Sequence, residues 1–283
     1  MEATLPSPLP TPALTPPQQE RYAALQAWLA GLDSAVVAFS GGVDSSLVAF
    51  LAHRALGERA LAVTSGSASL TRADLALSGK LTREWGMAHR VILTRESEDP
   101  RYLANPVDRC YFCKTNLYTD LVALARREGY AVVLNGINRD DQGDHRPGLL
   151  AAAEHGVRAP LAEHGFTKAD IRALAGQLGL SNAEKPQAAC LASRVPYGFS
   201  ISLPVLTQIE QAEQALRALG FAQLRVRHHG DVARIEVPVA DFERVLAQRE
   251  RIDEALRAVG YRYVALDLRG FRSGSLNEGL PRG

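Results

Sequence analysis

Hydrophobic and polar positions follow two different spacings in the first two thirds of this chain. Short runs of mainly apolar residues, each suited to a buried strand, occur at 35–39, 60–64, 89–93 and 131–135. Apolar positions recur at helical spacing at 18–32, 43–56, 71–85 and 111–128. Strands that alternate with helices in this way predict an α/β fold with a doubly wound parallel sheet.

The order of elements changes after residue 196. The pattern predicts a helix at 204–219, strands at 224–228 and 232–237, a helix at 242–259 and a strand at 263–268. This order is typical of a small α+β domain, and Pro196 and Gly198 are turn residues that suit a boundary. We therefore expect a larger α/β domain at 18–196 and a smaller domain at 197–283.

The composition is that of a soluble protein with a substantial core. Hydrophobic residues make up 46% of the 283 residues, and the prolines between Pro6 and Pro17 predict a disordered tail at 1–17. The net charge of +1 gives no bulk attraction to nucleic acid or to an anionic membrane. The sequence has neither an apolar stretch of membrane-spanning length nor a signal-peptide pattern, so we expect a cytoplasmic location.

A glycine-rich turn follows the first predicted strand and leads into a helix. Its sequence is Ser40-Gly41-Gly42-Val43-Asp44-Ser45-Ser46. The glycines let a phosphate approach the backbone, and the amides at the start of the helix attract an anion. No lysine follows the glycines, so this is not a Walker motif. The turn predicts a pyrophosphate-binding site, with catalytic roles for Asp44 and Ser45; an ordinary turn capped by either residue is the alternative.

The polar segment 135–148 follows the fourth predicted strand. Ligands of doubly wound sheets lie beyond the carboxyl ends of the strands, so this segment is expected to face the same crevice as the glycine turn. Its acidic side chains, Asp140, Asp141 and Asp144, are candidates for Mg²⁺, and Arg146 for phosphate. We also place Gly136, and Thr64 on the second strand, among the nucleotide contacts. A solvated turn with caps is the alternative.

Three cysteines are too few for a disulfide framework and are candidates for chemistry. Cys110 and Cys113 form a C-x-x-C at the start of a helix, a pattern that also fits a redox pair or half of a zinc site. With Cys190 they make three thiolates from two segments, enough to ligate three irons of a [4Fe-4S] cluster and leave the fourth open. Buried cysteines that act as small hydrophobes are the plain alternative. We favour the cluster.

Arg225 and Arg227 alternate on a predicted strand, so both side chains leave the same face. Two guanidinium groups on one face suit a phosphomonoester. Glu213 on the preceding helix is a candidate partner for them. A solvent-exposed charged face is the ordinary explanation of such a pair.

Taken together, these motifs resemble the LarE sulfur transferases, within the PP-loop class of ATP pyrophosphatases. The resemblance rests on segments 40–46, 108–114, 135–148, 190–198, 225–230 and 266–275. It implies that ATP adenylylates a carboxylate of pyridinium-3,5-biscarboxylic acid mononucleotide, and that sulfur then displaces AMP. The product belongs to the biosynthesis of the nickel-pincer nucleotide of lactate racemase.

The resemblance also implies roles for single residues and for the assembly. Arg225 and Arg227 match arginines that hold the substrate phosphate, and we assign Ser193, Arg194 and Glu213 to the same substrate site. Family members with one cysteine, at the position of Cys190, are thought to sacrifice its sulfur. Members with three cysteines use a [4Fe-4S] cluster that carries an extra sulfide, and this chain resembles them. The family forms hexamers, and the sulfur donor is unknown.

Two other functions fit parts of the sequence. A PP-loop tRNA thiolase uses similar chemistry, but it needs a basic RNA-binding surface or module, which the near-neutral charge disfavours. A non-catalytic, ATP-sensing sulfur carrier would keep the glycine turn and the thiols. Release of pyrophosphate with the dicarboxylate substrate distinguishes this carrier from an enzyme.

Overall fold

The computed structural model describes residues 14–141, 147–186, 189–272 and 274–278. These residues divide into two compact units that are not continuous in sequence. The first comprises 14–66, 73–93 and 114–186, and the second comprises 67–72, 94–113 and 189–278. The division differs from a single boundary near residue 196, because Tyr102, in segment 94–113, packs into the same hydrophobic core as Leu191 and Val195.

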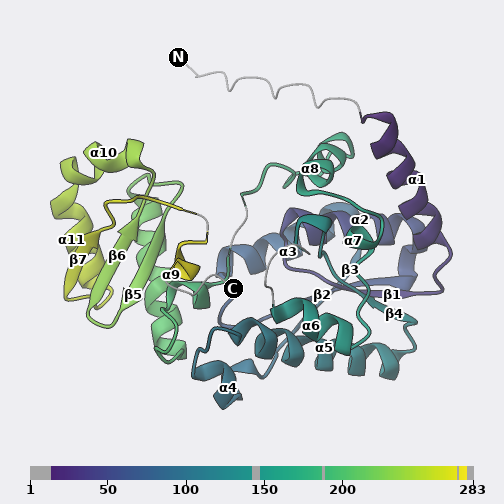
Figure 1. The fold of residues 1–283 in the computed structure, drawn as a ribbon, viewed down its shortest axis with the longest axis horizontal. Coiled ribbons are helices and arrows are strands. Elements are labelled where there is room, and N and C mark those ends of the chain that lie inside the picture. Colours follow the sequence, from purple (N-terminus) through teal and green to yellow (C-terminus); the bar gives the residue numbers. More distant parts are fainter. Residues whose placement is uncertain (1–13, 142–146, 187–188, 273, 279–283) are drawn as a thin grey trace. The chain divides into compact units, whose positions relative to one another are not determined.

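The first unit is built on a parallel sheet of four strands (Figure 1). The strands are β1 (Ala35–Ala38), β2 (Ala60–Ser65), β3 (Ala88–Ile92) and β4 (Val132–Leu134). Their spatial order is β3-β2-β1-β4, and Val37 of β1 is paired with Ala62 on one side and Leu134 on the other. The predicted parallel α/β sheet is confirmed.

Helices flank this sheet. They are α1 (Pro16–Ala30), α2 (Val43–Leu56), α3 (Arg72–Trp85), α5 (Arg109–Glu128), α6 (Pro147–Glu154), α7 (Pro160–Glu163) and α8 (Lys168–Gln177). Helix α2 is largely buried, with Leu47 and Leu51 in the core. Helix α1 begins at Pro16, inside the expected tail, because proline is compatible with the first helical turn. Residues 1–13, the rest of that tail, lie outside the described residues.

The second unit contains a three-stranded sheet with helices packed on it (Figure 1). Its elements are α4 (Pro100–Leu103), α9 (Leu203–Ala218), β5 (Arg225–His229), β6 (Val232–Glu236), α10 (Phe242–Ala247), α11 (Arg249–Ala258) and β7 (Tyr263–Leu266). Strand β6 is central, antiparallel to β5 and parallel to β7. The expected single helix at 242–259 is wrong, because the backbone of Gln248 (φ −106°, ψ 14°) leaves the helical conformation and separates α10 from α11.

Short 3-10 turns connect several of these elements. They lie at Gly57–Arg59, Glu96–Glu98, Arg139–Asp141, Leu191–Arg194, Val239–Asp241 and Ser275–Asn277. None of the helices in the described ranges is long and apolar enough to cross a membrane. Helices α7 and α8, which we did not predict, pack against α2 and so approach the glycine turn.

Candidate functional site

The glycine turn has the geometry expected of an anion-binding turn. Strand β1 ends at Ala38, and Gly42 precedes the first residue of α2 with an extended backbone. Gly41 has a φ of 71°, which favours glycine. Inside the turn, the Ser45 hydroxyl donates to the Gly42 carbonyl at 3.1 Å and accepts from the Ser40 amide at 3.2 Å. These bonds fix the turn while the start of α2 retains its helix-terminal amides.

The segment after β4 packs directly on this turn, as expected. A Cβ atom added to Gly136 would lie 2.6 Å from the Ser45 amide nitrogen and 2.8 Å from its Cα. Such distances are far below van der Waals contact, so only glycine fits at this position. The two segments are almost a hundred residues apart in sequence, and the parallel sheet places them at the same edge.

Two lysines that the sequence analysis missed contact the glycine turn. Lys168, the first residue of α8, forms an ion pair with the Asp44 carboxylate. Lys185 lies 2.6 Å from Asp74 and 3.3 Å from the Gly41 carbonyl oxygen. The pattern Thr167-Lys168-Ala169-Asp170 is a capping box and could have predicted α8, but nothing in the sequence indicated that the helix begins beside Asp44.

Asn182 supports the turn from the same region. Its side-chain amide donates to the Gly41 carbonyl at 3.1 Å and to the Ser46 hydroxyl at 2.8 Å. Within the described part of the chain, the Oδ1 atom of Asp44 is buried and accepts no hydrogen bond, so one carboxylate oxygen is available for a cation. The described turn therefore offers amides, hydroxyls and a carboxylate within one small volume.

The acidic residues of the segment after β4 are used mostly as caps. Asp140 accepts from the Lys168 amide at 2.8 Å, at the start of α8, and Asp141 accepts from the Asn138 amide at 3.1 Å. Asp144 and Arg146 lie outside the described residues. Thr64 is fully buried, and its hydroxyl is 2.9 Å from Nε2 of His89. Burial, followed by the charge of Arg83, lowers the pKa of His89.

All three cysteines belong to the second unit. Cys110 and Cys190 are exposed, so the alternative interpretation of these two cysteines as buried small hydrophobes is wrong. Cys113, one helical turn after Cys110, is partly buried against the core around Tyr102. Among the described residues, no three ligating side chains already form a metal site.

A buried arginine lies close to two of these thiols. Arg109, the first residue of α5, is 3% exposed. Burial lowers the pKa of its guanidinium, but the combined electrostatic influence of Cys190, Cys110, Tyr102 and Tyr197 outweighs this effect, and the pKa is raised. Cys110 and Cys190 therefore share one cationic neighbour.

The arginines of β5 are buried and not exposed. Arg227 binds the Glu236 carboxylate with Nε and Nη2, both at 2.9 Å, and donates to the Ser193 carbonyl at 2.6 Å and the Ser275 hydroxyl at 2.6 Å. The expectation of a solvated charged face is therefore wrong. The carboxylate partner of Arg227 is Glu236 and not Glu213.

Glu213 instead pairs with another residue of the expected substrate site. Its carboxylate, which is fully buried, accepts from Nε of Arg194 at 2.8 Å and from the Val226 amide at 3.2 Å. It also pairs with Arg217, at 3.0 Å. Two carboxylates thus neutralise Arg194 and Arg227 inside the second unit.

Arg225 differs from its two neighbours. Its guanidinium donates to the Arg272 carbonyl at 3.2 Å and lies over the Phe271 ring, 4.7 Å from the centroid. Within the described ranges it forms no ion pair with a carboxylate. Burial, followed by repulsion from Arg227 and Arg194, lowers its pKa, which is the environment of a cation that lacks an anion.

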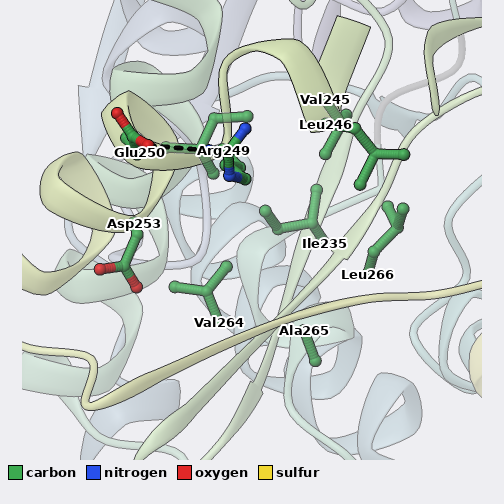
Figure 2. Close-up of a pocket in the computed structure, with 10 residues that line it drawn as sticks. Ile235, Val245, Leu246, Arg249, Glu250, Asp253, Val264, Ala265 and Leu266 are labelled. Atoms are coloured by element: carbon green, nitrogen blue, oxygen red, sulfur yellow. Dashed lines mark hydrogen bonds and ion pairs between the residues drawn. The ribbon is translucent and has the colours of Figure 1, made fainter. Parts of the chain in front are cut away.

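A separate groove of about 350 Å³ lies between β6, β7 and the helices α10 and α11 (Figure 2). Its lining is mainly aliphatic, with Arg249, Glu250 and Asp253 among the lining residues. None of the residues expected to bind nucleotide, substrate or metal lines it. The groove is therefore not the candidate site.

Comparison with known proteins identifies the family. A family model described as asparagine synthase matches residues 24–140, which contain the glycine turn. The pyridinium-3,5-bisthiocarboxylic acid mononucleotide synthase of Lactiplantibacillus plantarum is 40% identical over 263 residues, covering 93% of this chain and 95% of that protein. The chain belongs to the LarE family.

Two further relatives of this LarE family member have no stated function. An uncharacterised protein of Synechocystis sp. is 42% identical over 262 residues, which is 91% of this chain and 97% of that protein. An uncharacterised protein of Methanocaldococcus jannaschii is 31% identical over 173 residues, or 61% of this chain and 68% of that protein. The similarities to the Lactiplantibacillus plantarum and Synechocystis proteins extend across both units.

Proposed function

We propose that this LarE family member is an ATP-dependent sulfur transferase. It converts a carboxylate of pyridinium-3,5-biscarboxylic acid mononucleotide into a thiocarboxylate, in the biosynthesis of the nickel-pincer nucleotide of lactate racemase. The observation that carries the proposal is the 40% identity, over 95% of its length, to a relative named for the corresponding bisthiocarboxylic acid product. The glycine turn and the buried arginines of β5 support it, because both substrates carry phosphate.

The chemistry requires activation of the carboxylate before sulfur can enter. In the first step, a carboxylate oxygen attacks the α-phosphorus of ATP, and pyrophosphate leaves with the electron pair of the broken P–O bond. In the second step, a sulfur nucleophile adds to the carbonyl carbon, and AMP leaves as the C–O bond breaks. Each carboxylate therefore consumes one ATP.

The nucleotide contacts are assigned to the glycine turn and its neighbours. Amides and hydroxyls of Ser40, Gly41, Gly42, Ser45 and Ser46 would receive the pyrophosphate. Asp44 would hold Mg²⁺ through its unpaired oxygen, which is buried in the first unit. Lys168, which already contacts Asp44, adds the positive charge that the turn itself lacks.

The cysteines are assigned to an iron–sulfur cluster. Three thiols are the donor type that iron–sulfur clusters take, and Arg109 offsets the negative charge that Cys110 and Cys190 would contribute. Cys110, Cys113 and Cys190 would hold the [4Fe-4S] cluster, which, when bound, supplies a position for exogenous sulfide. The chain's own contribution is to hold the three thiols and to keep Cys190 intact.

The remaining assignments follow the family. Arg225 is the cation that we assign to the substrate phosphate, because within the described ranges it has no carboxylate partner. Ser193, Arg194, Glu213 and Arg227 would complete that substrate site. We also propose a larger α/β and a smaller α+β domain that act together, a homo-oligomer and a cytoplasmic location.

One reaction mixture tests the proposal. Anaerobically reconstituted protein is incubated with ATP, Mg²⁺, sulfide and the pyridinium dicarboxylate mononucleotide, and released pyrophosphate and thiocarboxylate product are quantified. We expect both to form in equal amounts, and Asp44→Asn to reduce them by about a hundredfold. The control is Asp33→Asn, at an exposed carboxylate outside the turn, which should retain parental activity. Parental protein that releases no pyrophosphate with this substrate contradicts the proposal.

The mass of the protein after the reaction identifies the source of the sulfur. If sulfide is the source, several products form per chain and Cys190 keeps its mass. If Cys190 donates its own sulfur, one product forms per chain and the residue becomes dehydroalanine, with the loss of the mass of hydrogen sulfide. Stoichiometric loss of Cys190 sulfur in iron-replete protein overturns the cluster assignment but not the transferase.

A further inference from the structure

Asn105 is an unusual residue in the second unit. It is fully buried, and its φ of 52° is the only positive φ of a non-glycine residue within the described ranges. Left-handed backbone at a non-glycine residue costs free energy, so the surrounding contacts must favour it. The residue lies between α4 and the start of α5, four positions before Arg109.

The Asn105 side chain binds the backbone that follows Cys190. Its Nδ2 atom lies 2.8 Å from the Pro196 carbonyl oxygen, 3.0 Å from that of Phe199 and 3.3 Å from that of Val195. The backbone carbonyl of Asn105 accepts from the Gly198 amide at 3.0 Å. One residue near the start of α5 therefore fixes the segment 195–199.

Arg109 extends this connection toward the thiols. Its Nη1 atom donates to Oδ1 of Asn105 at 2.6 Å and to the Ala192 carbonyl at 3.0 Å. Ala192 is two residues from Cys190, and Arg109 is adjacent to Cys110. Asn105 and Arg109 thus connect the segment that carries Cys110 to the backbone that follows Cys190.

A third contact fixes the residue that follows Cys190. The Leu191 amide donates to the Ser69 carbonyl at 2.8 Å, and the Ser69 hydroxyl lies 2.9 Å from the hydroxyl of buried Tyr102. Tyr102 packs with Leu191 and with Cys113 in one core. Every contact in this set lies within the second unit.

We propose that Asn105 and Arg109 are positioning residues that hold Cys190 against the start of α5, so that the three thiols act as one ligand set. The side-chain amide of Asn105 fixes the backbone after Cys190, and the guanidinium of Arg109 connects that backbone to Cys110. This inference rests on the proposed use of the three cysteines together. It adds two residues that bind no metal themselves.

Cobalt provides a test that needs neither the substrate nor iron. Co²⁺ prefers the same thiolates, and its sulfur-to-metal charge-transfer absorption grows with the number of bound thiolates. Reduced parental protein should bind one Co²⁺ with three thiolates. Cys190→Ser should lose about one third of that absorption, because one of three thiolates is removed. Asn105→Asp, Asn105→Gly and Arg109→Met should lose the same fraction although all three cysteines are present.

The variants separate positioning from general destabilisation. Asn105→Asp keeps the size of the side chain and the acceptor for Arg109 but replaces the donor to three carbonyls with an oxygen. Asn105→Gly keeps the left-handed backbone and loses only the side-chain bonds. Leu216→Ala is the matched control, because it weakens the other core of the same unit without touching this contact set.

The outcomes are distinct. Full three-thiolate absorption in both Asn105 variants, or the same loss in Leu216→Ala, overturns the proposal. Parental protein that binds Co²⁺ with fewer than three thiolates also overturns it, because the thiols then form no common set. Pyrophosphate release by the same preparations reports separately on the proposed transferase reaction.

Discussion

Charge neutralisation around the glycine turn depends on single residues that are distant in sequence. Asp44 is the acidic residue of the turn, and Lys168 is its ion-pair partner. A bound Mg²⁺–pyrophosphate would compete for both groups, since the metal seeks the carboxylate and the anion seeks the ammonium. Lys168 therefore opposes the binding of a metal ion alone at Asp44, whereas its positive charge favours pyrophosphate.

Replacement of Lys168 by methionine should change these two affinities in opposite directions. Mn²⁺ alone should bind more tightly, because Asp44 no longer has a competing cation. Pyrophosphate should bind more weakly, by the roughly 1.5–3 kcal/mol expected of a charged hydrogen bond. Calorimetric titration with each ligand measures both effects, and Lys168→Arg should restore part of the pyrophosphate affinity. A parallel decrease of both affinities would indicate a purely structural role.

Arg225 and Arg227 occupy the same face of β5 but should respond differently to substitution. Arg225→Met should raise the KM for the phosphorylated substrate roughly tenfold to a hundredfold, because a charged hydrogen bond is lost. Arg227→Met should lower the free energy of unfolding by about 3 kcal/mol, since the buried Glu236 carboxylate loses its two-point partner and keeps only Arg234, at 3.3 Å, and the Ser275 hydroxyl. Steady-state kinetics and chemical denaturation measure the two effects. Equal loss of stability in both variants would contradict the distinction.

At the scale of elements, the site depends on the approach of one strand end to one helix start. Parallel pairing of β1 with β4 places Gly136 against the backbone of Ser45. The same pairing explains why a glycine is required after β4, where a polar side chain would otherwise be compatible with a loop. Close approach of two backbones is a tertiary constraint that appears in the sequence as a single glycine.

Gly136→Ala should therefore disturb the glycine turn. The added methyl group must displace the start of α2, at a cost of about 1–3 kcal/mol for overpacking, and the affinity for pyrophosphate should fall. Gly31→Ala is the matched control, because its added Cβ meets only ordinary contacts at 3.5 Å and 3.7 Å and its φ is negative. Thermal unfolding and pyrophosphate titration compare the two variants. Parental affinity and stability in Gly136→Ala would rule out the close approach.

At the scale of the whole molecule, histidines whose pKa values are lowered in the folded protein link stability to pH. Burial and Arg83 lower the pKa of His89, and burial lowers that of His228. As the pH falls through about 6.5, the unfolded chain binds protons that the folded protein excludes, so folding becomes less favourable. Stability from these groups is complete above that pH and decreases toward the folded pKa values.

The midpoint of thermal unfolding should accordingly be lower at pH about 5.5 than at pH about 7.5. The double variant His89→Gln, His228→Gln should show a smaller difference between the two conditions, because it lacks two of the groups with a lowered pKa; His229, whose pKa is also lowered by burial, retains part of the difference. Calorimetry of parental and variant protein provides the measurement. A pH-independent midpoint in the parental protein, or an unchanged difference in the variant, would contradict the linkage.

The sequence by itself determined the α/β class, the strands, the glycine turn and the family. These features depend on local patterns, namely apolar periodicity and the residue types that a turn or a helix start requires. It did not determine the break at Gln248, because that break depends on how α10 and α11 pack on the small sheet. Nor did periodicity indicate α6, α7 and α8, which are short and lie within a polar region.

Only the tertiary structure decided which groups are neighbours. It paired Lys168 with Asp44, Glu236 with Arg227, and Asn105 with the backbone after Cys190. It also assigned the C-x-x-C segment and Cys190 to the same unit as β5, although a linear boundary near residue 196 would separate all three cysteines from that strand. Such pairings arise from the packing of segments that are distant along the chain, and sequence spacing carries no information about those distances. Residue chemistry is therefore readable from sequence, whereas the partner that each residue neutralises or positions is set by the fold.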